Sequence, residues 1–241
     1  MRKEYPDINN ALWYATKAHK GQMRKDNKTP YIEHPLEVAQ IVCTMTQVPS
    51  VVEAALLHDT VEDTAVRIND ITRIFGVYVA DLVADETENK RRSQPALDTW
   101  HIRKEEGIRK IAGAGADAKM ISLADKLSNL RAIKKALNEN GEVVWTWFHN
   151  PNVSDQAWYY RTMRDQYIGL KSTDAWKEYA QLVDEIFGGR AGEEPSYSVD
   201  LEDLEDLVYD DDLSELNVEE ENENEIDESP LEVGIDEDMD Y

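Results

Sequence analysis

Hydrophobic residues recur at helical spacing through the first 187 residues of the chain. In residues 7–20 the apolar positions return every three or four residues, which is the period of one face of an α-helix. Segments in which apolar and polar residues alternate are too short to build a sheet. The pattern predicts an all-α domain with further helices at residues 35–47, 51–58, 68–75, 78–85, 98–111, 118–137, 154–170 and 174–187.

A few residues with strong local preferences refine these helix boundaries. Pro35 suits the first turn of a helix, where a missing N–H costs little. Ser50 followed by Glu53 has the spacing of a capping box, and this predicts that Ser50 caps the helix over 51–58. The apolar segment 143–148 is ambiguous between a short strand and a loop packed on the core.

The charge pattern divides the chain near residue 187. The formal net charge is −24, and residues 188–241 carry −22 of it, from 23 acidic residues and one arginine. Like charges at this density oppose compaction, so we expect a disordered tail that could bind an unknown basic partner. Residues 1–187 are nearly neutral and long enough for one well-buried core. The sequence thus predicts a domain at 1–187 and an acidic tail at 188–241.

Composition excludes several classes of protein. No stretch approaches the roughly 20 apolar residues needed to span a bilayer, and the N-terminus lacks the apolar run of a secretory signal. The single cysteine, Cys43, excludes an internal disulfide framework and a cysteine-rich zinc site. These features fit a reducing, cytoplasmic setting. The negative charge argues against nonspecific binding to nucleic acid, because a polyanion repels phosphates.

Four histidine and aspartate residues stand at positions that suit metal ligation. His58 and Asp59 end an apolar helix, where adjacent side chains can diverge around one ion. Asp125 interrupts an apolar run, and a carboxylate buried there needs a cation or strong hydrogen bonds. We expect His34 to be held in an extended conformation by the following Pro35. Two imidazoles and two carboxylates suit Mn²⁺, Fe²⁺ or Zn²⁺, and the share of carboxylates favours Mn²⁺.

Each of these residues also has a plainer interpretation. A His-Asp pair occurs by chance in many proteins. His34 alone fits a helix-entry residue with local hydrogen bonds, and Asp125 alone fits a core carboxylate bonded to a neighbouring helix. The metal hypothesis gains weight from the residues that accompany the four.

Further polar residues follow the candidate ligands by one helical turn. Glu62 and Asp63 lie four residues after the His-Asp pair, so a carboxylate pair stands beside the metal if the turn continues. Such carboxylates could orient an attacking water and accept its proton while the metal lowers the pKa of that water. The alternative is that they simply end the helix. Asn129 lies four residues after Asp125, on the same helix face.

A basic group precedes His34. Cations beside a metal are what a polyphosphate substrate requires, whereas without a metal they would form an ordinary solvated face. The group comprises Lys17, Lys20, Arg24, Lys25 and Lys28.

Three motifs, in the same order, resemble the hydrolase domain of the RelA/SpoT type. ATKAHKGQMRK at 15–25 with TPYIEHP at 29–35 resembles the opening of that domain. AALLHDTVEDT at 54–64 is similar to its HD-xx-ED signature, and LADKLSNLR at 123–131 to its closing motif. The resemblance covers about residues 7–187 and includes no synthetase domain. It therefore points to the stand-alone small alarmone hydrolases, the Mesh1-like proteins.

This resemblance implies an HD-superfamily helical bundle and a specific reaction. The enzyme would remove the 3′-diphosphate of guanosine tetra- or pentaphosphate, (p)ppGpp, releasing pyrophosphate and GDP or GTP. The implied Mn²⁺ ligands are His34, His58, Asp59 and Asp125, and the implied catalytic carboxylates are Glu62 and Asp63. The implied nucleotide contacts are Arg24 at the guanine, Lys25 and Asn129 nearby, Lys90 at the phosphates, and Tyr159.

The later helices match the family poorly. Where relatives place an arginine before an aromatic pair, this chain has DQAWYY at 155–160, and the loop 138–152 and the acidic tail lie outside the family pattern. These departures leave the metal chemistry unchanged but leave the substrate open. One alternative is an HD phosphohydrolase acting on another nucleotide, such as the 2′-phosphate of NADPH. Another is a binding or antitoxin-like protein that acts through its acidic tail.

Overall fold

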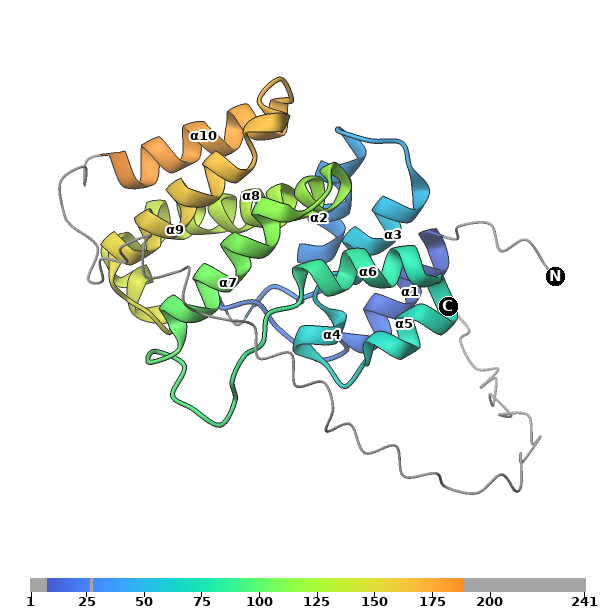
Figure 1. Ribbon diagram of the computed structural model, residues 1–241. Coiled ribbons are helices and arrows are strands. Elements are labelled where there is room, and N and C mark those ends of the chain that lie inside the picture. The colour runs from blue at the N-terminus through green and yellow to red at the C-terminus, as the bar shows by residue number, and fades with distance from the viewer. Residues whose placement is uncertain (1–7, 27, 189–241) are drawn as a thin grey trace, which may run out of the picture. The chain divides into compact units, whose positions relative to one another are not determined.

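The computed structural model describes residues 8–26 and 28–188 (Figure 1). These residues form helices joined by short connections, and the only strand-like pairing among them is one bridge between Met23 and Pro30. The all-α prediction is therefore confirmed for this part of the chain. The helices are α1 (Ile8–Ala18), α2 (Glu33–Cys43), α3 (Pro49–Leu57), α4 (Thr60–Asp63), α5 (Ile68–Phe75), α6 (Val77–Glu86), α7 (Trp100–Gly113), α8 (Ala116–Asn140), the 3-10 helix η1 (Gly141–Trp147), α9 (Val153–Gln166), the 3-10 helix η2 (Ile168–Leu170) and α10 (Asp174–Phe187).

Apart from Gly188, the predicted acidic tail lies outside the described residues, and its disorder and its partner stay predictions. Across the described ranges, no helix combines the length and the apolar character that crossing a membrane would require.

Two helices form the centre of the core. Every residue of α3 from Val51 to Leu57 is buried, because α1, α2, α6 and α8 pack around that helix. A helix surrounded in this way must be apolar on nearly all its faces. The 25-residue α8 packs against α2, α3 and α6 and also contacts α10. In Figure 1, α1 to α6 lie toward one end of this long helix and α9 and α10 toward the other.

The start of α3 differs from the prediction. The helix begins at Pro49, its N-cap residue is Val48, and no side chain caps it, so the capping box predicted at Ser50 and Glu53 is wrong. Pro49 at the first helical position explains the start, since its fixed φ angle is already helical. Glu53 is 3% exposed, so it faces the interior of the bundle.

The expectation that His34 is extended is also wrong. α2 begins at Glu33 and ends at Cys43, which places His34 in its first turn. The N–H groups of Glu33 and His34 bond the carbonyls of Pro30 and Tyr31, at 3.2 and 3.0 Å. These hydrogen bonds outweigh the extended preference of a residue that precedes proline.

Two later segments also differ from their predicted form. The ambiguous segment 143–148 falls largely within η1, with Val144 and Trp145 buried against the core, so it is neither a strand nor an irregular loop. The helix predicted over 154–170 ends at Gln166, and the chain tightens into η2.

Candidate metal centre

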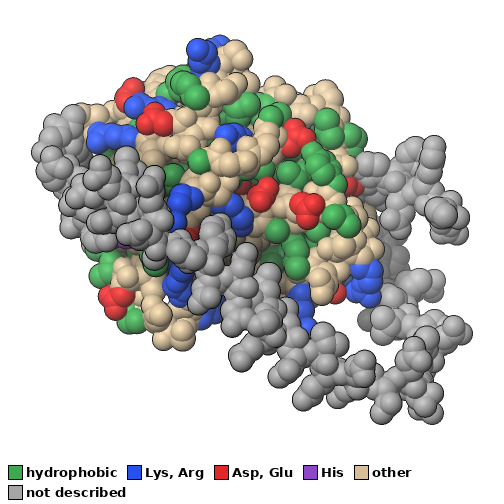
Figure 2. Space-filling model, viewed as in Figure 1, with side chains coloured by type: hydrophobic (Ala, Val, Ile, Leu, Met, Phe, Trp, Pro, Cys, Tyr) green, Lys and Arg blue, Asp and Glu red, His purple; other side chains and the backbone are tan. Residues whose placement is uncertain are grey.

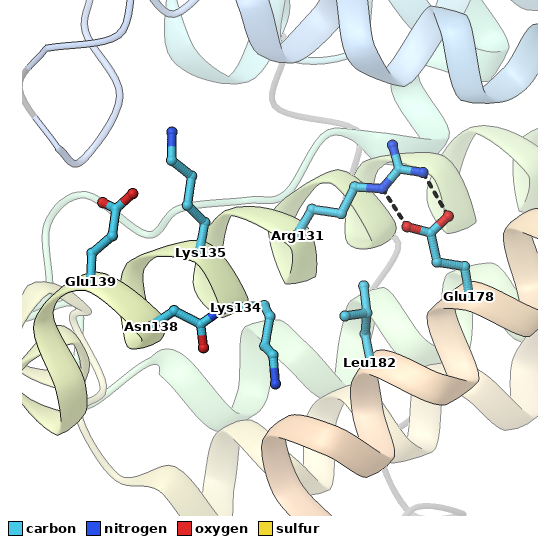
Figure 3. Close-up of a pocket in the computed structure, with 7 residues that line it drawn as sticks. All are labelled: Arg131, Lys134, Lys135, Asn138, Glu139, Glu178 and Leu182. Atoms are coloured by element: carbon cyan, nitrogen blue, oxygen red, sulfur yellow. Dashed lines mark hydrogen bonds and ion pairs between the residues drawn. The ribbon is translucent and has the colours of Figure 1, made fainter.

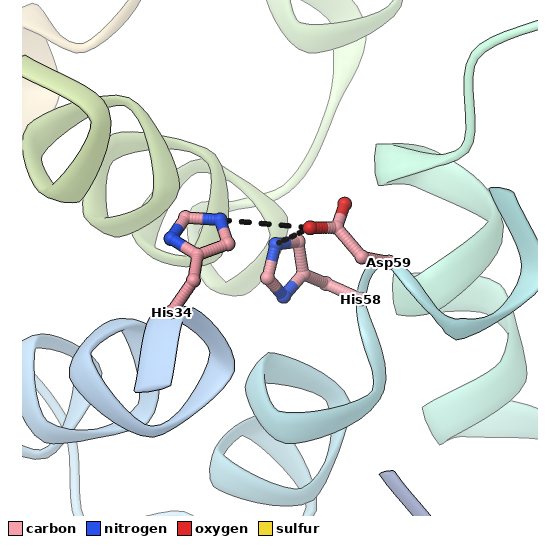
Figure 4. Close-up of side chains that lie close together, drawn as sticks. All are labelled: His34, His58 and Asp59. Carbon is pink, nitrogen blue, oxygen red and sulfur yellow. Dashed lines mark ion pairs between the residues drawn. The ribbon is translucent and has the colours of Figure 1, made fainter. Parts of the chain in front are cut away.

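Side chains from three parts of the fold converge at one point. His34 comes from α2, His58 and Asp59 come from the junction of α3 and α4, and Asp125 comes from α8. Figure 4 shows His34, His58 and Asp59 with their functional groups turned toward one another. The convergence depends on the helix break at this junction, because His58 ends α3 and Asp59 precedes α4.

The distances between the donor atoms fit a single ion. Asp59 Oδ2 lies 3.5 Å from His34 Nε2 and 3.0 Å from His58 Nε2. Asp125 Oδ1 lies 3.0 Å from His34 Nε2 and 3.8 Å from His58 Nε2. Metal bonds of about 2.1 Å place neighbouring ligand atoms roughly 3.0–3.4 Å apart in octahedral or tetrahedral geometry. His34, His58 and Asp59 therefore form a group that could hold one metal ion, and Asp125 contacts both histidines of that group.

The hydrogen bonds behind the two histidines fix which nitrogen carries the proton. Ser128 Oγ donates to Glu37 at 2.7 Å, so that oxygen accepts from His34 Nδ1 at 2.9 Å. His58 Nδ1 donates to the carbonyl of Ala55 at 2.8 Å. With both Nδ1 atoms protonated, Nε2 is the nitrogen that each ring turns toward the carboxylates. This is the tautomer that metal ligation requires.

The electrostatics of this point favour a positive charge. Burial alone would lower the pKa of His58, but the Asp59 and Asp125 carboxylates raise it to about 10. Burial would raise the pKa of Asp59, but the two histidines hold it below its usual range. His58 Nε2 is also buried without a hydrogen-bond partner within the described residues. The two carboxylates stabilise positive charge among these side chains, whether a proton on His58 or a metal ion, so the donor set fits a divalent metal.

A chain of polar contacts supports His34 from behind. Glu37, which accepts from Ser128, also accepts from Arg131 at 2.9 Å. Figure 3 shows Arg131 at a groove between α8 and α10, where two N–H groups bond Glu178 at 2.7 and 2.6 Å. Contacts of this kind orient a ligating histidine. Sequence reasoning missed them, although Ser128 lies three residues after Asp125, on the same helix face.

Glu62 and Asp63 lie on the single turn of α4, directly after the metal centre. Tyr31 donates its hydroxyl to Asp59 Oδ2 at 2.6 Å and lies 3.0 Å from Asp63 Oδ2. The Lys90 ammonium lies 3.2 Å from Glu62 and also contacts Asp63. The helix does break at His58, but the following turn keeps the carboxylate pair beside the candidate ligands.

The environment of Glu62 suits proton transfer. Burial raises the pKa of its carboxyl group, and the nearby charge of Asp59 adds to that effect. The backbone N–H of Glu88 donates to Glu62 Oε2 at 2.8 Å and fixes the orientation of the carboxylate. A carboxylate with a raised pKa is a better proton acceptor than an ordinary one.

The Arg24–Lys25 segment reaches the site on a tight hairpin between α1 and α2. Arg24 N–H donates to the Thr29 carbonyl at 2.8 Å, which closes the hairpin. The Arg24 guanidinium donates to Asn129 at 3.2 Å, and Asn129 donates to Asp125 at 2.8 Å. Arg24 and Asn129 are thus connected directly to the candidate metal ligand on α8.

The other predicted residues divide into two groups. The Lys25 ammonium lies 3.7 Å from the ring centroid of Phe148, and Tyr159 is buried with the ammonium of Lys104 at 5.1 Å from its ring centroid. Lys17 instead lies over Trp13, at 4.2 Å. Lys20 and Lys28 are exposed, as Lys25 is, but no aromatic contact of the kind Lys25 makes is found for them within the described residues. Only part of the basic group therefore faces the centre.

Comparison with known proteins finds relatives of this chain. Residues 11–149 match a family model described as an HD domain. The human protein named guanosine-3′,5′-bis(diphosphate) 3′-pyrophosphohydrolase MESH1 is 37% identical over 142 residues, covering 58% of this chain and 76% of its own. The Drosophila melanogaster protein of that name is 34% identical over 190 residues, covering 74% and 92%. A solved structure, described as a metazoan ortholog of SpoT that hydrolyzes ppGpp, aligns with a TM-score of 0.56 at 29% identity and covers 78% of this chain and 98% of that one.

Proposed function

This chain belongs to the HD domain family, and we propose that it is a metal-dependent hydrolase that removes the 3′-diphosphate of (p)ppGpp. The products are pyrophosphate and GDP or GTP. The observation that carries the proposal is the convergence of two histidines and two aspartates beside the Glu62–Asp63 pair. Relatives that this chain matches over most of their length are named for the same reaction.

The metal is a divalent cation, and we propose Mn²⁺ held by His34, His58, Asp59 and Asp125. Equal numbers of imidazoles and carboxylates make a mixed nitrogen and oxygen set, for which the carboxylate share favours Mn²⁺ over softer ions. When bound, the metal would lower the pKa of a water and offset the charge of the phosphate under attack.

The carboxylates of α4 would activate that water. Glu62 accepts its proton, which the raised pKa of this carboxyl group favours. Asp63, held by Lys90 and close to the Tyr31 hydroxyl, would orient the water toward phosphorus. The water oxygen forms a new bond to phosphorus, and the bond from phosphorus to the ribose 3′ oxygen breaks. The ribose oxygen regains a proton, and pyrophosphate leaves.

The remaining site residues would hold the nucleotide. Arg24 would lie against the guanine, since its guanidinium is planar and Asn129 fixes its position. Lys25 and Lys90 carry the positive charge that phosphates require. Tyr159, which is buried next to Lys104, would form part of the wall.

The test is to incubate the full chain with ppGpp and Mn²⁺ and to identify the products. We expect GDP and pyrophosphate in equal amounts, and finding neither would refute the function. The segment 155–160 lacks the arginine that the resembling proteins place before an aromatic pair, and its first residue, Asp155, is buried and accepts from Asn150 at 2.8 Å. That difference makes a second substrate worth testing, and orthophosphate released from NADPH would identify it.

A binding or antitoxin-like role through the tail is tested by deletion. We expect that removing residues 190–241 leaves turnover intact, because the proposed ligands, catalytic carboxylates and nucleotide contacts all lie between Arg24 and Tyr159. Loss of activity would show that the tail contributes to the reaction. The cytoplasmic setting stays a prediction.

A further inference from the structure

His19 and Gln22 lie in the turn that follows α1, beside the segment α4. Their backbones are joined by a hydrogen bond from the Gln22 N–H to the His19 carbonyl at 3.0 Å. Gly21, between them, has a φ angle of 81°, in the left-handed region that glycine adopts most readily. The turn therefore places the two side chains next to each other at the start of the hairpin that carries Arg24.

The amide of Gln22 bridges this turn and α4. Its Nε2 donates to the backbone carbonyl of Asp63 at 2.9 Å, across 41 residues of sequence. Because a carbonyl can only accept, the amide turns its Oε1 to the other side, where it lies 2.8 Å from His19 Nδ1. Oε1 also only accepts, so His19 Nδ1 carries the proton and donates the hydrogen bond. The two bonds form a continuous chain from the imidazole to the last residue of α4.

The His19 ring has a second contact, with Tyr31. The two rings are stacked, with their centroids 4.8 Å apart and their planes 29° apart. Tyr31 donates its hydroxyl to Asp59 Oδ2 and lies 3.0 Å from Asp63 Oδ2. One imidazole therefore supports both the amide that holds the backbone of Asp63 and the phenol that lies beside its side chain.

A histidine costs free energy at this position. His19 is 3% exposed, and its Nε2 has no hydrogen-bond partner within the described residues. An apolar ring could stack on Tyr31 without leaving a buried nitrogen unsatisfied, but it would lack the Nδ1 donor to Gln22. In Figure 2, charged side chains stand at the surface, where water weakens their contacts. Water cannot easily replace a hydrogen bond made by this buried ring.

We propose that His19 and Gln22 are positioning residues that hold α4, and with it Glu62 and Asp63, beside the metal centre. α4 is one turn of four residues, and a turn this short depends on contacts from outside it. The inference rests on the proposed function, since the proposed roles of the two carboxylates make their position matter for turnover. The chain of bonds ends at the Asp63 carbonyl and not at a candidate ligand, so its loss should lower turnover and leave the metal bound.

The experiment compares Gln22→Met, which keeps the length of the side chain and removes both hydrogen bonds, with Gln166→Met. Gln166 is the matched control, because its amide also donates to a backbone carbonyl, that of Thr162 in α9, at 3.4 Å. Gln22→Met should lower kcat for ppGpp roughly 5- to 30-fold, the loss expected when a partly buried carbonyl loses its donor. KM and Mn²⁺ affinity should stay near their wild-type values, and the control should keep wild-type kcat.

His19→Phe separates the two contacts of the imidazole, because the phenyl ring can still stack on Tyr31 but cannot donate to Gln22. The variant also removes the unsatisfied Nε2, so we expect a melting temperature near that of the wild type. Its kcat should nevertheless fall roughly three- to tenfold. The double variant with Gln22→Met should lose no more than Gln22→Met alone, because the effect of His19 passes through Gln22. Losses that multiply, or an unchanged kcat in His19→Phe, would overturn the inference.

Hydrogen exchange of the Asp63 amide supplies a readout that needs no turnover. This N–H bonds the Asp59 carbonyl at 2.9 Å, so its exchange rate reports how often α4 opens. We expect exchange to be roughly 5- to 30-fold faster in Gln22→Met and unchanged in Gln166→Met. Unchanged exchange in Gln22→Met, or a loss of Mn²⁺ affinity alongside the loss of turnover, would contradict the positioning role. Faster exchange in a chain whose wild type hydrolyses no ppGpp would refute the proposed function and leave the positioning role standing.

Discussion

Ser128→Ala is expected to weaken metal binding without removing a proposed ligand. The Ser128 hydroxyl is the acceptor for His34 Nδ1, and both residues are buried, so water cannot replace it. Metal ligation through Nε2 requires the proton on Nδ1, and in the variant that N–H has no acceptor. Without metal, the ring can carry its proton on Nε2 and bond Asp125, 3.0 Å away. The cost therefore falls on the metal-bound state.

The expected loss of metal affinity follows from the free-energy cost of leaving a buried hydrogen-bond donor without an acceptor. Leaving one such group without a partner costs about 1–3 kcal/mol. At 1.4 kcal/mol for each factor of ten, this corresponds to a loss of roughly 5- to 150-fold in metal affinity. The range agrees with the 10- to 100-fold effect typical of outer-shell partners of a ligating histidine.

Calorimetric titration of metal-free protein with Mn²⁺ would measure the change. Ser122→Ala is the matched control, because Ser122 is a buried serine on the same helix that accepts from Tyr167 at 3.0 Å and does not bond a histidine. We expect wild-type metal affinity in the control. An Mn²⁺ affinity in Ser128→Ala equal to that of Ser122→Ala would refute the reasoning that this hydrogen bond selects the metal-binding tautomer.

Asp59→Ala should lose metal and turnover together, whereas Glu62→Ala should keep the metal and lose ~10²–10⁴-fold in kcat, as for a general base. Measuring metal content and turnover in each variant checks both expectations. Loss of metal from Glu62→Ala would mean that the ligand and general-base roles have been exchanged. Burial, together with the charges of Arg24 and Lys104, lowers the pKa of Lys25 to about 8, and this predicts that kcat/KM declines as pH rises through 8, since the ammonium then loses its proton. Lys25→Arg should move this decline to higher pH, and an unmoved profile would contradict the assignment. Chelation should lower the melting temperature, because a metal at 100 times its Kd stabilises the fold by about 2.7 kcal/mol; identical melting curves with and without chelator would argue against a metal site.

Much of the centre could be predicted because its signals are local in sequence. His58 and Asp59 are adjacent at a helix end, and Asp125 stands in an apolar run that α8 buries in the core. The structure brings these residues and His34 within 3.0–3.8 Å of one another along the four contacts between imidazole and carboxylate. Their roles as ligands stay proposals. The long helices were predictable for the same reason, since apolar periodicity is strong where a helix is long.

The supporting contacts could not be predicted because they join distant segments. Ser128 and Glu37 are 91 residues apart, and Arg131 reaches Glu178 across 47 residues. Each of these residues is a common polar residue of a helix when the sequence is considered alone, and only the packing of α2, α8 and α10 brings the side chains into contact. The start of α3 was mispredicted for a different reason: Ser50 and Glu53 have capping-box spacing, but Pro49 already fits the first helical position.

The proposed catalytic carboxylates lie on the element least able to hold itself in place. α4 has four residues. A single helical turn is unstable alone, because fixing its backbone costs more free energy than its first hydrogen bond supplies. Lys90 contacts both Glu62 and Asp63, but an arriving phosphate competes for that ammonium. The Tyr31 hydroxyl and the Glu88 backbone N–H are neutral donors with no such conflict. They can keep α4 in position while the lysine turns toward the substrate. We therefore expect α4 to keep its geometry when Lys90 also binds the substrate phosphate. Two neutral donors that hold it come from Tyr31, before α2, and from Glu88, after α6.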